Sequence, residues 1–111
     1  MGNKRNKDRA PVDIYLNKYV GGVPYMARAS NISTDGVRLA HLIEPQLNKK
    51  RVGLQFQLPG SEEVIYAEGE VVREWLSSNA TEGSGIKFTL LTERHKKLIT
   101  EYVSRVGDDG H

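Results

Sequence analysis

The sequence predicts a mainly β protein, a small six-stranded antiparallel β-barrel with a C-terminal α-helix and a flexible basic arm at its N-terminus. Short stretches in which apolar and polar residues alternate recur along the chain with turn residues between them, a pattern typical of small barrels. Near the C-terminus the spacing of apolar residues changes from two to three or four, which indicates a helix. Closing the sheet removes exposed strand edges, which suits a chain of only 111 residues.

The length fits a single domain, which we expect to span residues 11–107, between a basic arm at 1–10 and a disordered tail at 108–111. The chain has no Cys, so it forms neither disulfides nor a thiolate metal site. It shows no apolar stretch of membrane-spanning length and no signal peptide. We therefore expect a cytoplasmic protein that does not insert into a membrane.

The chain begins with the arm, in which four Lys or Arg residues accompany one Asp and almost no apolar residue. Such a segment buries too little apolar surface to order itself, so we expect it to be mobile without ligand. Apolar and polar residues alternate from Pro11 to Leu16, which predicts a half-buried strand. Gly21-Gly22 then predicts a turn into a second strand near residues 25–30.

Four more strands are predicted by the same alternation. The third begins at Gly36, and the fourth, over Val52–Leu58, has the clearest pattern in the chain. The fifth runs from Val64 to about Glu74, with a bend or bulge expected at Gly69. The sixth is indicated by the alternating apolar residues Ile86, Phe88 and Leu90.

The polar residues 77–84 predict a loop before the last strand, and a helix is predicted after it. Thr92 is expected to cap the N-terminus of this helix, and Gly107 is expected to end it. The residues that follow helical spacing are His95, Leu98, Ile99, Tyr102, Val103 and Val106. We expect the helix to cover one opening of the barrel.

Two motifs point to a family. Arg5 and Arg9 form an R-x-x-x-R pair, and residues 31–36 read N-x-S-x-x-G. Further on, residues 85–88 (Gly-Ile-Lys-Phe) lead into the predicted helix. The order and separation of these features resemble the PilZ domain, which binds the bacterial second messenger cyclic di-GMP. The resemblance implies a receptor module and not an enzyme.

The resemblance assigns Arg5 and Arg9 to one guanine edge and one phosphate of the ligand, in an order that stays open. The planar fork of Arg suits either group, because it donates two parallel hydrogen bonds. The alternative interpretation of Arg5 and Arg9, which would be favoured if the second motif were absent, is a solvated basic tail. The residue just before the pair influences whether one ligand or a stacked pair binds in the family, and here Lys4 leaves both options open.

The second motif supplies polar groups for the same ligand. Asn31 would accept hydrogen bonds from guanine N1–H and N2–H₂, and Ser33 would offer its hydroxyl to base or phosphate. Many members carry Asp at the position of Asn31, which accepts with two charged oxygens. Gly36 would permit a positive backbone dihedral or a close approach of the chain to the ligand. The alternative is an ordinary turn, since these residue types dominate turns.

Two residues of the fifth strand are weaker candidates. Trp75 is the only Trp, and it either stacks on a guanine or packs at the core or rim of the barrel. Arg73 precedes it on the same face of the strand and either reaches a phosphate or is solvated.

No enzyme motif accompanies these residues. The sequence lacks H-E-x-x-H, G-x-S-x-G and a phosphate-binding G-x-x-x-x-G-K-[ST], so we expect no catalysis, no metal and no cofactor. The predicted function is a cyclic di-GMP receptor that changes its arm position and surface on binding and signals to a separate partner protein. One alternative is a PilZ-like interaction module that needs no ligand. Another is a small nucleic-acid-binding barrel that uses residues 4–9 and 49–51, although few aromatic residues are available for base stacking.

Overall fold

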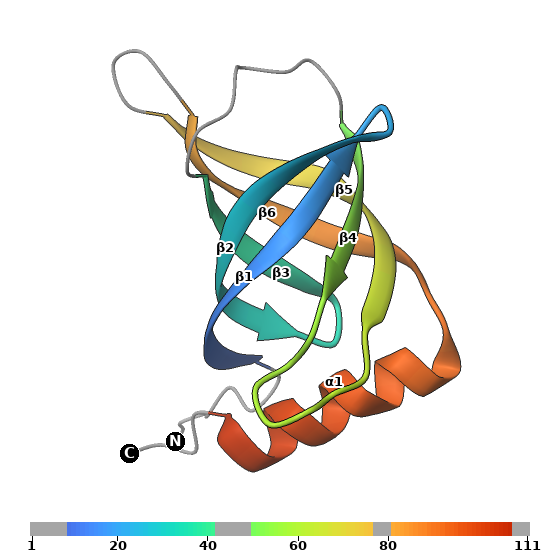
Figure 1. Ribbon diagram of the computed structural model, residues 1–111. Helices are drawn as coiled ribbons and strands as arrows, with labels where there is room; N and C mark the ends of the chain where they lie inside the picture. The colour runs from blue at the N-terminus through green and yellow to red at the C-terminus, as the bar shows by residue number, and fades with distance from the viewer. Residues whose placement is uncertain (1–8, 42–49, 77–80, 108–111) are drawn as a thin grey trace.

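The structure is a computed structural model that describes residues 9–41, 50–76 and 81–107. The described part contains β1 (Arg9–Val20), β2 (Val23–Ser33), β3 (Gly36–His41), β4 (Arg51–Phe56), β5 (Ile65–Leu76), β6 (Thr81–Leu91) and α1 (Glu93–Val106). The strands form a closed barrel in the order β1-β2-β3-β6-β5-β4, and every neighbouring pair is antiparallel (Figure 1). The predicted six-stranded barrel with a C-terminal helix is therefore confirmed.

The barrel interior is filled by alternate residues of the strands, as the sequence pattern predicts. Burying one Val, Leu or Ile side chain contributes about 1.5–3 kcal/mol, so this interior supplies the main driving force for folding. The strand residues of the hydrophobic core are Ala10, Val12, Leu16, Val20, Ala27, Ala29, Ile32, Val37, Leu39, Val52, Leu54, Phe56, Ile65 and Ile86.

A two-residue turn joins β1 to β2, since Val20 pairs directly with Val23. Gly21 and Gly22 both have positive φ, at 59° and 84°. Tight hairpin turns that match the right-handed twist of the strands require this conformation, and glycine adopts it without steric cost.

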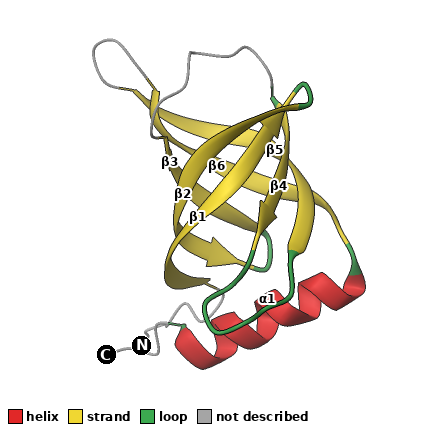
Figure 2. Cartoon of the chain, viewed as in Figure 1, coloured by secondary structure: helices red, strands yellow, loops and turns green. Residues whose placement is uncertain are grey.

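The helix α1 lies across one end of the barrel (Figure 2). Thr92 caps it, because its side-chain oxygen accepts a hydrogen bond from the His95 backbone N–H at 3.2 Å. At the other end the Gly107 N–H donates to the Val103 carbonyl. The Tyr102 hydroxyl donates to a β1 backbone carbonyl at 2.9 Å, which ties the helix to the start of the barrel. The buried residues of the helix are Ile99, Tyr102 and Val103.

Most strand boundaries differ from the sequence prediction by one to four residues. β2 covers Val23–Ser33 instead of about 25–30, β4 ends at Phe56 instead of Leu58, and β5 covers Ile65–Leu76 instead of 64–74. β1 begins at Arg9 instead of Pro11, because Arg9 and Ala10 pair with Ser33 and Ile32 of β2. β6 begins at Thr81, so residues 81–84 are strand and not loop. Residues 1–8 and 108–111, the rest of the expected arm and tail, lie outside the described residues.

The β5–β6 register explains a break in the predicted alternation. Glu68 pairs with Leu90 while the next residue, Gly69, pairs with Phe88, so Thr89 is an extra residue in β6. The irregularity lies beside Gly69, where one was expected, but the extra residue is in β6 and not in β5. It turns Leu90 outward, where 53% of its surface is exposed. The inward row that includes Ile86 therefore does not extend to Leu90.

Candidate functional site

A groove of about 750 Å³ lies on the outside of the barrel, across β2, β3, β6 and β5. Its volume falls within the range usual for small-molecule sites, about 300–1,000 Å³. It is lined by Arg9, Asn31, Ser33, Asp35, Gly36, Val37, Arg38, Val72, Arg73, Trp75, Gly85, Ile86 and Lys87. Six of the eight residues expected from the sequence are in this set, and the other two, Lys4 and Arg5, lie outside the described residues.

The strand register explains why these residues meet. Asn31 of β2 pairs with Arg38 of β3, Arg38 pairs with Gly85 of β6, and Gly85 pairs with Arg73 of β5. These four residues form one row across four strands, and each strand adds about 4.8 Å. In the neighbouring row Arg9 pairs with Ser33. The two motifs and the fifth strand are thus distant in sequence but adjacent on the barrel surface.

Ser33 holds the turn between β2 and β3. Its Oγ accepts hydrogen bonds from the backbone N–H groups of Asp35 and Gly36, both at 3.1 Å. Asn31 and Ser33 themselves belong to β2, so this strand continues beyond the predicted residues 25–30 and only two residues separate it from β3. In this structure the Ser33 oxygen therefore shapes the edge of the groove, and its expected contact with ligand stays a prediction.

Gly36 is required by close packing and not by its dihedral angles. Among the described residues only Gly21, Gly22 and Gly60 have positive φ, so the expected positive dihedral at Gly36 is wrong. A Cβ at Gly36 would lie 2.1 Å from the carbonyl oxygen of Ile86 on β6. The approach that glycine permits here is between β3 and β6.

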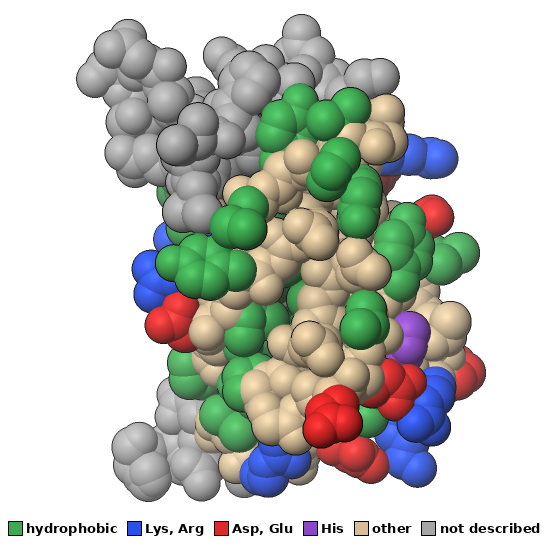
Figure 3. Space-filling view, in the orientation of Figure 1, with side chains coloured by type: hydrophobic (Ala, Val, Ile, Leu, Met, Phe, Trp, Pro, Cys, Tyr) green, Lys and Arg blue, Asp and Glu red, His purple; other side chains and the backbone are tan. Residues whose placement is uncertain are grey.

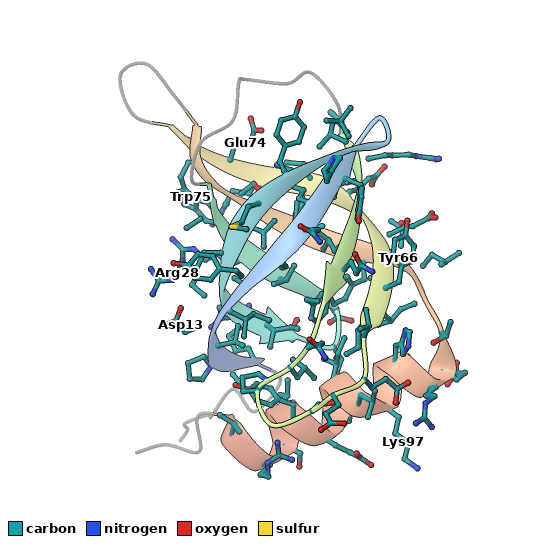
Figure 4. The ribbon with its side chains drawn as sticks, viewed as in Figure 1. Asp13, Arg28, Tyr66, Glu74, Trp75 and Lys97 are labelled. Atoms are coloured by element: carbon teal, nitrogen blue, oxygen red, sulfur yellow. The ribbon has the colours of Figure 1, made fainter. Side chains whose placement is uncertain are left out.

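Trp75 lies outside the hydrophobic core, half-buried on the wall of the groove (Figure 4). The guanidinium carbon of Arg38 is 4.1 Å from the centre of its ring, and that of Arg73 is 5.7 Å away. Both distances are within the range of cation–π contact, about 6 Å. Trp75 is therefore not a core residue, and two of the expected roles, stacking on a guanine and packing at the rim of the barrel, stay open.

The groove carries a positive charge. Arg9, Arg38, Arg73 and Lys87 line it together with a single carboxylate, Asp35. Such a cluster on a concave surface attracts anions and raises their local concentration. Sequence reasoning missed Arg38 and Lys87, although each lies next to an inward-facing apolar residue on its strand and so faces outward.

A second hollow, of about 700 Å³, lies elsewhere on the barrel. Tyr66 lines it and lies on the opposite side of Figure 4 from Trp75. Its charged lining residues are one cation, Arg51, and one anion, Glu68. The barrel face turned to the viewer in Figure 3 is largely hydrophobic or uncharged. The charge of the first groove therefore favours an anionic ligand, whereas the charges that line this hollow cancel.

Within residues 9–41, 50–76 and 81–107, no group of three His, Asp or Glu side chains could hold a metal ion. No helix in the same part of the chain is long and apolar enough to cross a membrane.

A small barrel with a cationic groove on its outer face defines a class of ligand-binding modules. The family model of the PilZ domain matches residues 3–105, and the chain belongs to this family. PilZ domains are cyclic di-GMP receptor and adaptor modules. No curated protein matches the chain in sequence.

Solved structures share the fold. The inhibitor of motility MotI/DgrA of Bacillus subtilis aligns with a TM-score of 0.76 at 15% identity, over 93% of this chain and 51% of that one. The chain thus spans about half the length of that protein. The PilZ domain of CeSA from a cellulose-synthesizing bacterium aligns with a TM-score of 0.64 at 14% identity, over 90% and 98% of the two chains. An uncharacterized Legionella protein aligns with a TM-score of 0.57 at 15% identity, over 87% and 90%.

Proposed function

We propose that this protein is a cytoplasmic receptor for cyclic di-GMP, which binds in the groove and signals to a separate partner protein. One observation carries the proposal. Residues predicted from two motifs and from the fifth strand line the same groove, in which four cations accompany one carboxylate. Cyclic di-GMP offers two guanines and two anionic phosphodiesters, and the groove offers groups suited to each.

In this mechanism Arg9 donates a bidentate pair of hydrogen bonds to a phosphate or a guanine edge. Asn31 accepts from the donor edge of a guanine. Arg5 and Lys4 reach the ligand from the arm, which orders around it on binding. Ordering costs about 1–2 kcal/mol per residue, so the contacts of Arg5 must exceed that cost. The partner protein recognises the new position of the arm and the changed charge of the groove.

Replacing Asn31 by aspartate tests the assignment of the guanine edge. A carboxylate accepts two charge-assisted bonds, so we expect cyclic di-GMP to bind at least as tightly to Asn31→Asp as to the wild type. Asn31→Ala should weaken binding roughly five- to tenfold, since it removes a hydrogen bond worth about 1–1.5 kcal/mol. Isothermal titration calorimetry measures both.

Asn17→Asp is the matched control, because Asn17 is exposed on β1 and lines a different surface. It adds the same charge and should leave affinity unchanged. Loss of binding in Asn31→Asp but not in Asn17→Asp would show that Asn31 does not face a guanine donor edge.

A further inference from the structure

We propose that Arg38 contacts the ligand, and that its guanidinium, held over the ring of Trp75, forms the surface on which a guanine stacks while Asn31 holds that guanine by its edge. The inference rests on the proposed function and adds a residue outside both sequence motifs.

The position of Arg38 supports this role. It is exposed, and it pairs with Asn31 on one side and with Gly85 on the other. Adjacent strands are about 4.8 Å apart, so the Arg38 backbone lies between Asn31 and the part of the groove that holds Arg73 and Trp75. A ligand that contacts both Asn31 and the Trp75 end must pass over Arg38.

The Trp75 ring packs against β6 and contacts Arg38. The ring atoms Cε3 and Cη2 of Trp75 lie 3.6 and 3.8 Å from the positions that a Cβ would take at Gly83 and Gly85. The ring therefore lies close to the backbone of β6 at Gly83 and Gly85. Arg38 then lies 4.1 Å from the ring centre, closer than Arg73 at 5.7 Å.

The guanidinium of Arg38 remains available for a ligand. Arg28 and Arg94 form salt bridges with Asp13 and Glu63, whereas the contact described for Arg38 within the same part of the chain is with the Trp75 ring. A planar guanidinium stacked on an aromatic ring keeps its donors and its second face, and nucleic-acid bases stack on such planes. A Lys ammonium has the charge but no plane, so charge and stacking can be separated by mutation.

Titration of cyclic di-GMP into the wild type, Arg38→Lys and Arg38→Met tests the proposal. Base stacking contributes about five- to hundredfold in affinity. We expect Arg38→Lys to bind at least fivefold more weakly than the wild type, and Arg38→Met at least tenfold more weakly. Arg51→Met is the control, since Arg51 is an exposed strand arginine on β4, opposite β3 in the barrel, and it should bind within twofold of the wild type.

Two further readouts separate stacking from loss of structure. Melting curves check that each variant is folded. The fluorescence of Trp75, the sole Trp, should change in Arg38→Met without any ligand, because the stacked cation is gone. In a double-mutant cycle, Arg38→Met in a Trp75→Leu background should cost much less affinity than in the wild type.

The outcomes distinguish the inference from the function on which it rests. If the wild type binds and both folded Arg38 variants bind within twofold of it, Arg38 is not a ligand contact and the receptor function stands. If Arg38→Lys binds like the wild type while Arg38→Met does not, only charge matters and the stacking role is wrong. If the wild type shows no binding, the proposed function fails and the role of Arg38 fails with it.

Discussion

Replacing Arg9 by alanine should remove most cyclic di-GMP binding and leave the fold intact. A charge-assisted bidentate contact is worth roughly 1.5–3 kcal/mol, so affinity should fall by about ten- to a hundredfold. Arg9 is exposed at the first position of β1, and its pairing with Ser33 is through the backbone. The free energy of unfolding of the variant should therefore be within about 0.5 kcal/mol of that of the wild type. Calorimetric titration and thermal melting measure the two effects.

Arg51→Ala serves as the matched control for Arg9→Ala, because it removes the same charge from an exposed strand position outside the groove. It should change affinity by less than about twofold at moderate ionic strength. Arg5→Ala should also weaken binding strongly, because Arg5 and Arg9 are expected to hold the same ligand. Wild-type affinity in both Arg9→Ala and Arg5→Ala would show that the ligand does not bind where we place it.

Replacing Gly36 by alanine should strongly destabilise the fold. Its Cβ would lie 2.1 Å from the carbonyl oxygen of Ile86, and it would also approach the Lys87 backbone at 3.3 Å. Because these neighbours are backbone atoms of a paired strand, β3 and β6 must move apart. Overpacking of this kind costs about 2–3 kcal/mol, which lowers the melting temperature by roughly 10–20 °C in a domain of this size.

Gly85→Ala is the control for this effect. A Cβ at Gly85 would meet its nearest neighbour, the Cβ of Arg73, at 3.7 Å, which is ordinary van der Waals contact. A surface substitution of this kind changes the free energy of unfolding by about 0.5 kcal/mol or less. The melting temperature of Gly85→Ala should therefore stay within a few degrees of that of the wild type. Equal melting temperatures for Gly36→Ala and Gly85→Ala would show that the close β3–β6 approach is not needed for stability.

The local parts of the fold were predictable from the sequence because they depend on neighbouring residues. The alternation around Val12 and Leu54 identified strands, and Gly21-Gly22 identified their tightest turn. Thr92 identified the start of the helix because threonine is a common N-cap residue, and its side chain accepts a hydrogen bond from a backbone N–H of the first turn. Each of these features is decided within a few residues, where propensity and periodicity operate.

The remaining features depend on strands that are far apart in the chain. Leu90 turns outward because the β5–β6 register skips Thr89, and no local pattern encodes that register. Position 36 requires a glycine because a side chain there would collide with the carbonyl oxygen of Ile86, fifty residues further along the chain. Arg38 enters the site through its pairing with Asn31 and its contact with Trp75, which the barrel creates. The motifs located the groove, but its complete lining required the closed sheet.

Calorimetric titration of the wild-type chain with cyclic di-GMP tests the central claim most directly, because it gives affinity and stoichiometry together. The account predicts saturable binding of one or two ligands per chain, which weakens as salt is raised because the groove is cationic. A generic oligonucleotide titrated in the same way should give no saturable heat. Absence of saturable binding of cyclic di-GMP up to about 1 mM, where the binding free energy is only about −4 kcal/mol, would contradict the receptor function.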